Sequence, residues 1–108
     1  MSYDRGLEAQ LREDLEPHAP RAQKMFGGVC FMVRGHMVCG VHKTGALVRV
    51  GAPNMAAAQA LSGVGPMTMT GRSMSGFVDV TPEAAGDDAI RARLLALALS
   101  FNASLPPK

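Results

Sequence analysis

The amino-acid sequence predicts an α+β fold, in which helices pack on an antiparallel sheet. The chain has 108 residues, the length of one domain, so residues 1–108 are expected to form a single unit. Apolar residues make up 47% of the chain and charged residues 19%, a balance that excludes a disordered protein. Strand-like segments also follow one another through short turns, and such turns join antiparallel strands.

The first expected element is a helix over residues 4–16. Its apolar stripe consists of leucines at every fourth position, Leu7, Leu11 and Leu15. Asp4 can serve as the N-cap or as an acidic residue of the first turn. Pro17 ends the helix because the residue before a proline is pushed out of the α region. We expect residues 17–23 to be a connector.

Three strands follow as a meander, at residues 29–33, 36–41 and 46–50. Arg34 and Gly35 form the turn between the first two strands, because a two-residue hairpin turn favours glycine where φ is positive. Residues 42–45 form the second turn of the meander.

The second half of the chain predicts a short helix, two strands and a long helix, at residues 55–61, 67–70, 74–80 and about 89–103. Asp87 and Asp88 precede the long helix as N-cap and first-turn acid. Thr81 and Pro82 start a loop or a single turn, and residues 104–108 are expected to be a flexible tail. The expected order of elements is therefore α-β-β-β-α-β-β-α.

The hairpin turn also predicts the register of the first two strands. Counting outward from Arg34 and Gly35, Cys30 lies opposite Cys39, with Cα atoms about 4.5 Å apart and within reach of a disulfide. One interpretation of this pair is a thiol-based redox sensor. The other is two small core residues that stay reduced in the cytosol.

Apolar side chains fall on both faces of this hairpin. One face carries Val29, Phe31, Val33, His36 and Val38, and the other carries Cys30, Met32, Met37, Cys39 and Val41. The long helix has a wide apolar arc of Ile90, Leu94, Leu97 and Phe101, with Leu95 and Leu99 beside them. Helices can cover one face of the sheet, and we expect a second copy of the chain, in a homodimer, to cover the other.

The net charge of +2 is unevenly distributed along the chain. Residues 1–16 carry two basic and five acidic side chains, a charge of −3, and residues 17–80 carry six basic and one acidic, a charge of +5. The sheet and its turns are therefore the basic part. The candidate contacts to an anion or a nucleic acid are Arg21, Lys24, Arg34, Lys43 and Arg72. The alternative is that these residues are solubilising charges at the tips of turns.

No set of residues indicates catalysis or ligand chemistry. No serine stands in the G-x-S-x-G pattern of a nucleophile elbow. By strand parity His36 and His42 lie on the other face from the cysteines, so a mixed zinc site cannot close. We therefore expect no enzyme activity, no metal and no cofactor. No apolar run approaches the roughly 20 residues of a membrane span, and the N-terminus lacks a signal sequence, so we expect a cytoplasmic protein without membrane contact.

Several segments, taken in order, resemble the N-terminal domain of the TfoX/Sxy family. They are Lys24–Val29 (KMFGGV), Phe31–Gly35 (FMVRG), Ala46–Val50 (ALVRV), Met74–Val80 (MSGFVDV) and a closing helix that ends in SLPPK. The positions that match the family's motifs are Lys24, Met25, Phe26, Gly27, Gly28, Gly35, Arg49, Met74 and Gly76. The resemblance covers nearly the whole chain, from about residue 7 to residue 108.

This resemblance implies an α+β fold of the secretion-chaperone-like kind, often dimeric, and a link to the regulation of competence and DNA uptake in bacteria. The family has no catalytic residues. The leading interpretation is therefore a small, non-enzymatic regulatory domain that acts as a homodimer and binds a partner protein. Two alternatives stay open: a nucleic-acid-associated transcriptional regulator that uses the basic sheet and turns, and a thiol-based sensor that uses Cys30 and Cys39.

Overall fold

The computed structural model describes residues 4–25, 27–69 and 72–106. Its strands are β1 (Arg21–Met25), β2 (Gly28–Val33), β3 (His36–His42), β4 (Gly45–Arg49), β5 (Val64–Met69) and β6 (Arg72–Val80). Its helices are α1 (Arg5–Leu15), α2 (Met55–Gln59), α3 (Pro82–Ala85) and α4 (Asp88–Ser104), with 3-10 turns at Glu16–His18 and Ala52–Asn54.

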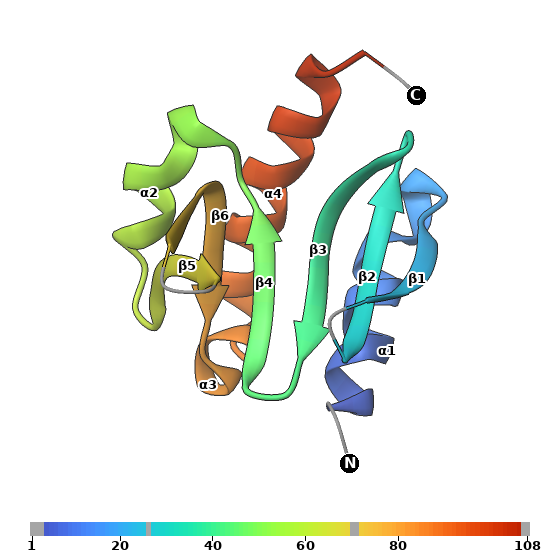
Figure 1. The fold of residues 1–108 in the computed structure, drawn as a ribbon. Helices are drawn as coiled ribbons and strands as arrows, with labels where there is room; N and C mark the ends of the chain where they lie inside the picture. Colours follow the sequence, from blue (N-terminus) through green and yellow to red (C-terminus); the bar gives the residue numbers. More distant parts are fainter. Residues whose placement is uncertain (1–3, 26, 70–71, 107–108) are drawn as a thin grey trace.

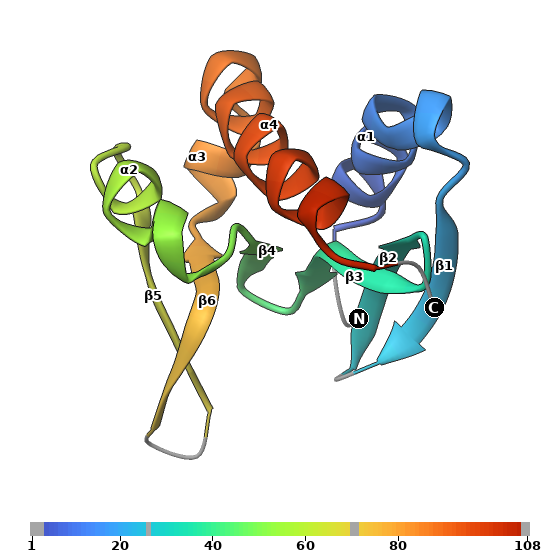
Figure 2. The same cartoon turned by 90° about the horizontal axis from the view of Figure 1, so that it is seen from above.

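The strands form one antiparallel sheet in the order β1-β2-β3-β4-β6-β5, which confirms the predicted α+β fold (Figure 1). Seen from above, α1, α3 and α4 lie over one face of this sheet, and no described helix covers the opposite face (Figure 2). Both expected N-caps are confirmed. The Asp4 carboxylate accepts the backbone N–H of Leu7 at 3.1 Å, and the Asp87 carboxylate accepts that of Ile90 at 3.0 Å.

The two edge strands differ most from the prediction. β1 occupies part of the segment where the sequence predicted a connector. The sequence did not indicate this strand because its residues 21–24 are exposed and show no apolar alternation. Hydrogen bonding to β2, rather than burial, makes this segment a strand. At the other edge, β5 begins before Pro66. An edge strand tolerates a proline, since one of its sides needs no backbone N–H.

The predicted register of the β2–β3 hairpin is correct only next to its turn. Met32 pairs with Met37 as expected, but the register then shifts by one residue, so Phe31 pairs with Cys39 and Cys30 with Gly40. A β-bulge inserts one extra residue into one strand, and counting outward from a turn cannot foresee it. The prediction that Cys30 lies opposite Cys39 is therefore wrong.

The bulge also changes which side chains share a face. Cys39 and Val41 join the helix-covered core with Phe31, while Cys30 stays on the opposite face. His42 follows Val41, so it shares the face of Cys30 rather than lying across the sheet from both cysteines.

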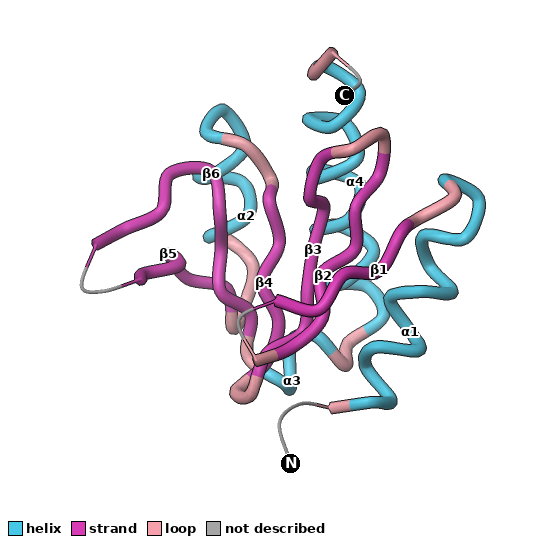
Figure 3. The backbone as a smooth tube through the Cα atoms, turned by 45° about the vertical axis from the view of Figure 1, so that its right-hand side comes forward, coloured by secondary structure: helices cyan, strands magenta, loops and turns pink. Residues whose placement is uncertain are grey.

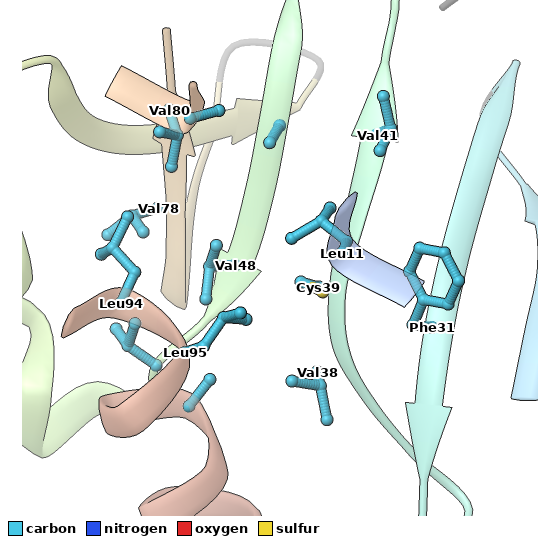
Figure 4. Packing of buried hydrophobic residues seen from close by; sticks show 14 of the residues in the cluster. Leu11, Phe31, Val38, Cys39, Val41, Val48, Val78, Val80, Leu94 and Leu95 are labelled. Carbon is cyan, nitrogen blue, oxygen red and sulfur yellow. The ribbon is translucent and has the colours of Figure 1, made fainter. Parts of the chain in front are cut away.

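The core lies between the helix layer and the sheet. Leu11 of α1 and Leu94 and Leu95 of α4 pack against side chains of the central strands, among them Phe31 and Val48 (Figure 4). The predicted leucine stripe of α1 is confirmed, since Leu7, Leu11 and Leu15 are its buried residues.

In α4 the buried stripe is rotated from the predicted one. Its buried residues are Arg91, Leu94, Leu95, Ala98 and Asn102, while Ile90, Leu97 and Leu99 are only partly buried at its flanks. Two polar residues thus occupy core positions, and several apolar ones lie toward solvent. The spacing of apolar residues cannot locate the buried face of such a helix, because an arginine or asparagine in the sequence is expected to be exposed.

Polar contacts fix the C-terminal end of α4 to the β2–β3 turn. The buried amide of Asn102 donates to the backbone oxygen of Val33 at 2.9 Å, and Arg34 Nη1 donates to the backbone oxygen of Asn102, also at 2.9 Å. His36 Nε2 lies 2.7 Å from the backbone oxygen of Pro106. Three side chains, two from the hairpin and one from α4, thus connect the β2–β3 turn to the end of α4 and to the residues that follow it.

Candidate interaction surfaces

The face of the sheet that no described helix covers carries a small apolar group. We call Cys30, Met32, Met37 and Leu47 the uncovered patch. Cys30 and Leu47 are buried, with 2% and 5% of their surface exposed, whereas the partners Met32 and Met37 are only half-buried. Pairing across the strands places Cys30, Gly40, Leu47 and Asp79 in one row of this face. The two methionines are therefore the part of the patch that solvent reaches.

A histidine–aspartate pair borders this patch. Nε2 of His42 in β3 lies 2.9 Å from Oδ1 of Asp79 in β6, so the pair spans β4, which lies between those strands. The backbone N–H of Thr44 donates to His42 Nδ1 at 3.1 Å, so the ring proton resides on Nε2 and is donated to Asp79. The sequence could not indicate this pair, because it depends on β6 returning to lie beside β4.

Arg49, a position of the family motifs, lies against two aromatic rings. Its guanidinium carbon lies 5.7 Å from the centre of the Phe77 ring and 5.4 Å from that of the Phe101 ring. Phe77 is its cross-strand partner in β6, and Phe101 belongs to α4. Arg49 therefore connects the sheet to the long helix, through contacts that stabilise by about 0.5–1 kcal/mol each.

The family-motif glycines serve backbone geometry. Gly27, Gly35 and Gly76 have φ values of 75°, 84° and 88°, which L side chains rarely adopt. Gly28 lies so close to β3 that a Cβ atom there would overlap the backbone carbonyl of Val41. Of the remaining motif positions, Met74 is half-buried in β6. Met25 closes β1, but its side chain and the whole of Phe26 lie outside the described residues.

The two cysteines are both buried thiols and form no disulfide. They point to opposite faces of the sheet, so a disulfide between them would require β2 or β3 to rearrange. Burial raises the pKa of the Cys30 thiol. For Cys39, burial and then the neighbouring Cys30 raise the pKa far above its ordinary value. Both thiols therefore stay protonated at neutral pH, whereas a reactive cysteine needs a lowered pKa.

The buried Cys39 thiol predicts a loss of stability in alkaline solution. Its pKa is raised in the folded protein, so above about pH 8.5 the unfolded chain releases a proton that the folded chain retains. Rising pH then favours unfolding, by up to about 1.4 kcal/mol per pH unit from this thiol. We expect Cys39→Val to flatten the fall in unfolding free energy between pH 8.5 and 10, measured by urea titration. Lys43→Gln, in an exposed turn, is the control, and equal slopes in wild type and Cys39→Val would contradict the assignment.

The structure does not gather the predicted basic residues onto one surface. Arg34 lies in the turn between β2 and β3 and Lys43 in the turn between β3 and β4, at opposite ends of the sheet (Figure 1). Arg34 is engaged with α4, and Arg21 is exposed on β1. The side chain of Arg72 lies outside the described residues. Lys24 instead lines a cleft beside α1, together with Arg5 and Arg12, which a count of charge along the chain had assigned to the acidic helix.

A further apolar groove of about 460 Å³ lies between α1 and α4. Its lining residues are Asp14, Asp88, Arg91, Ala92, Leu95, Ala96 and Leu99. The two carboxylates at its edge, Asp14 and Asp88, accept hydrogen bonds from Arg91. The groove is thus a second surface with apolar character, formed entirely by helices.

In the described part of the chain, no three His, Cys, Asp or Glu side chains converge as metal ligands. None of its helices combines the length and the apolar character that crossing a membrane requires.

The comparison with protein families gives one result. The family model of the TfoX N-terminal domain matches residues 13–102, most of the chain and all of the sheet. No curated protein and no solved structure matches the sequence. The matched range includes the glycines and Arg49, whose backbone and stacking roles are described above. The chain belongs to the TfoX N-terminal domain family.

Proposed function

We propose that this domain is a non-enzymatic, cytoplasmic regulator that acts by binding proteins and that it forms a homodimer through the uncovered patch. Its family membership supports a role in the regulation of bacterial competence and DNA uptake. The observation that carries the proposal is the half-buried pair Met32 and Met37 on the face of the sheet that the chain's own helices leave open. Apolar side chains in such a position are typical of an interaction surface.

Two physical arguments support a second copy of the chain as the partner at this surface. In a two-fold dimer the same patch faces itself, so one apolar group completes both halves of the interface. Methionine side chains are flexible and polarisable, which lets Met32 and Met37 adapt to their symmetry mates. The pair His42 and Asp79 supplies a polar border, and an apolar centre within a polar rim is the usual anatomy of an interface.

Sedimentation velocity over a concentration series tests this arrangement. We expect the wild-type chain to sediment as a dimer and Met37→Glu to sediment as a monomer, because the dimer would bring two carboxylates together in an apolar contact. The expected loss of dimer affinity is about 100-fold or more. Ala96→Glu places the same charge in the exposed groove between α1 and α4 and should leave the dimer intact.

Two outcomes contradict the proposal. One is a wild-type chain that remains monomeric at the highest concentration. The other is a dimer that Ala96→Glu dissociates and Met37→Glu does not, since that result would place the interface on the helices.

A further inference from the structure

A cleft of about 320 Å³ is lined by residues of α1 and of the edge strand β1, which lie at the same end of the molecule (Figure 3). Its lining residues are Arg5, Glu8 and Arg12 of α1, Ala22, Gln23 and Lys24 of β1, and Val29 of β2. Three cationic residues, two from α1 and one from β1, therefore line the cleft with one acidic residue, Glu8. The segment of the sequence that holds α1 is nevertheless acidic overall. The fold separates the charges of α1 and directs the basic ones toward β1.

The cations of this cleft are positioned from two sides. Arg5 and Arg12 are seven residues apart, so they share one face of the helix. The Arg12 guanidinium lies 5.3 Å from the centre of the buried Phe31 ring and 3.2 Å from Glu8, yet 52% of its side chain is exposed. Lys24 approaches from β1. It pairs with the core residue Val29, which places it on the helix-facing side of the sheet.

The acidic residues of α1 other than Glu8 do not line this cleft. Asp14 accepts a hydrogen bond from Arg91 at 2.6 Å, which directs it toward α4. Asp4 caps the N-terminus of its own helix. Among the described residues that line the cleft, Glu8 is the one carboxylate, and it accepts a hydrogen bond from Arg12 at 3.2 Å.

The same cleft borders a strand edge. Among the described strands, β1 has a neighbour, β2, on one side only, and its residues 21–24 are exposed. Such an edge presents backbone N–H and C=O groups to which an extended peptide can add as a further strand. A peptide bound there would run along the mouth of the cleft, where an acidic side chain could reach Arg12 and Lys24.

We propose that β1 binds an extended, acidic segment of a partner protein as an added strand, with one carboxylate held in the cleft by Arg12 and Lys24. The backbone of the edge supplies general affinity, and the cations select the acidic residue. This inference rests on the proposed function as an interaction domain but not on self-association, because the cleft and the uncovered patch use different residues.

The probe is a capped eight-residue peptide of alternating valine and threonine with one central glutamate, compared with the same peptide carrying glutamine. Binding is measured by fluorescence anisotropy, and the shifts of the β1 amide signals in NMR locate the peptide. We expect the glutamate peptide to bind about tenfold tighter, with shifts confined to β1 and the adjacent face of α1. Lys24→Glu, at an exposed position, should reverse the preference, so that a lysine peptide binds tighter than the glutamate one.

Arg12→Gln should abolish the preference for the glutamate peptide. The matched control is Arg93→Gln, which removes one exposed cation from α4 and should leave this preference unchanged. Three outcomes would overturn the proposal: no preference between glutamate and glutamine peptides up to millimolar concentration, an equal loss in Arg93→Gln, or tighter binding of duplex DNA through Arg12 and Lys24. Met37→Glu should retain peptide binding, so a failure of the dimer and a failure of the cleft give different results.

Discussion

Gly28→Ala is expected to cost about 4 kcal/mol or more of unfolding free energy, a large part of the roughly 5–15 kcal/mol that stabilises a typical domain. A Cβ atom at this position would overlap the backbone carbonyl of Val41 and press on the backbone of His42. No side-chain rotation can relieve an overlap with backbone atoms. The start of β2 would have to separate from β3, and with it the part of the sheet that holds Val29 in the core.

The adjacent glycine provides the control. Gly27 has φ of 75°, but an added Cβ atom would meet no other atom. Gly27→Ala is therefore expected to lose only about 1–2 kcal/mol of unfolding free energy, from the unfavourable backbone conformation. Urea unfolding followed by circular dichroism compares the two variants. Equal losses of unfolding free energy in the two variants would contradict the tight approach of β2 to β3. Both glycines would then matter only for their backbone conformation.

Arg91→Met is expected to cost about 3 kcal/mol. Only 9% of the Arg91 side chain is exposed, and its nitrogens contact Asp14 at 2.6 Å, Asp88 at 2.8 Å and the backbone oxygen of Ala85 at 3.0 Å. Burial alone would lower the pKa of this guanidinium, but its bonds to Asp14 and Asp88 raise it above its ordinary value. Methionine fills much of the space but leaves the Asp14 carboxylate, which is 24% exposed, without its cation.

Thermal or urea unfolding measures this loss, with Arg93→Met, at an exposed position of the same helix, as the control. Adding Asp14→Asn to Arg91→Met should recover part of the stability, because the uncompensated charge is then removed. Asp88→Asn should have little effect by itself, since 90% of the Asp88 side chain is exposed. A stability of Arg91→Met equal to that of Arg93→Met would show that the Arg91 contacts do not hold α1, α3 and α4 together.

Elements specified by local signals could be predicted from the sequence. Leucines at helical spacing and a capping aspartate predicted α1, and Arg34 with Gly35 predicted the β2–β3 turn. Elements that depend on distant partners could not be predicted. β1 exists because β2 provides its hydrogen-bonding partner, and the register shift between Phe31 and Met32 has no local signal in the sequence.

The same distinction holds for the candidate surfaces. The sequence predicted apolar residues on both faces of the hairpin, and the structure leaves Met32 and Met37 on the open one. The sequence could not indicate that Arg12 and Lys24 line one cleft, because this depends on where β1 lies relative to α1. No signal in the sequence indicated the buried Arg91, whose contacts with Asp14, Ala85 and Asp88 depend on how three helices pack together.

Oxidation of the methionine side chains by hydrogen peroxide tests the central claim most directly. Met32 and Met37 lie in the uncovered patch, and Met55 in α2 is also only partly buried and serves as the internal standard. Raising the protein from low micromolar to several hundred micromolar should slow oxidation of Met32 and Met37 several-fold, as a second copy covers them, and leave Met55 unchanged. If all three methionines oxidise at the same rates at both concentrations, the uncovered patch is not the surface through which this domain associates.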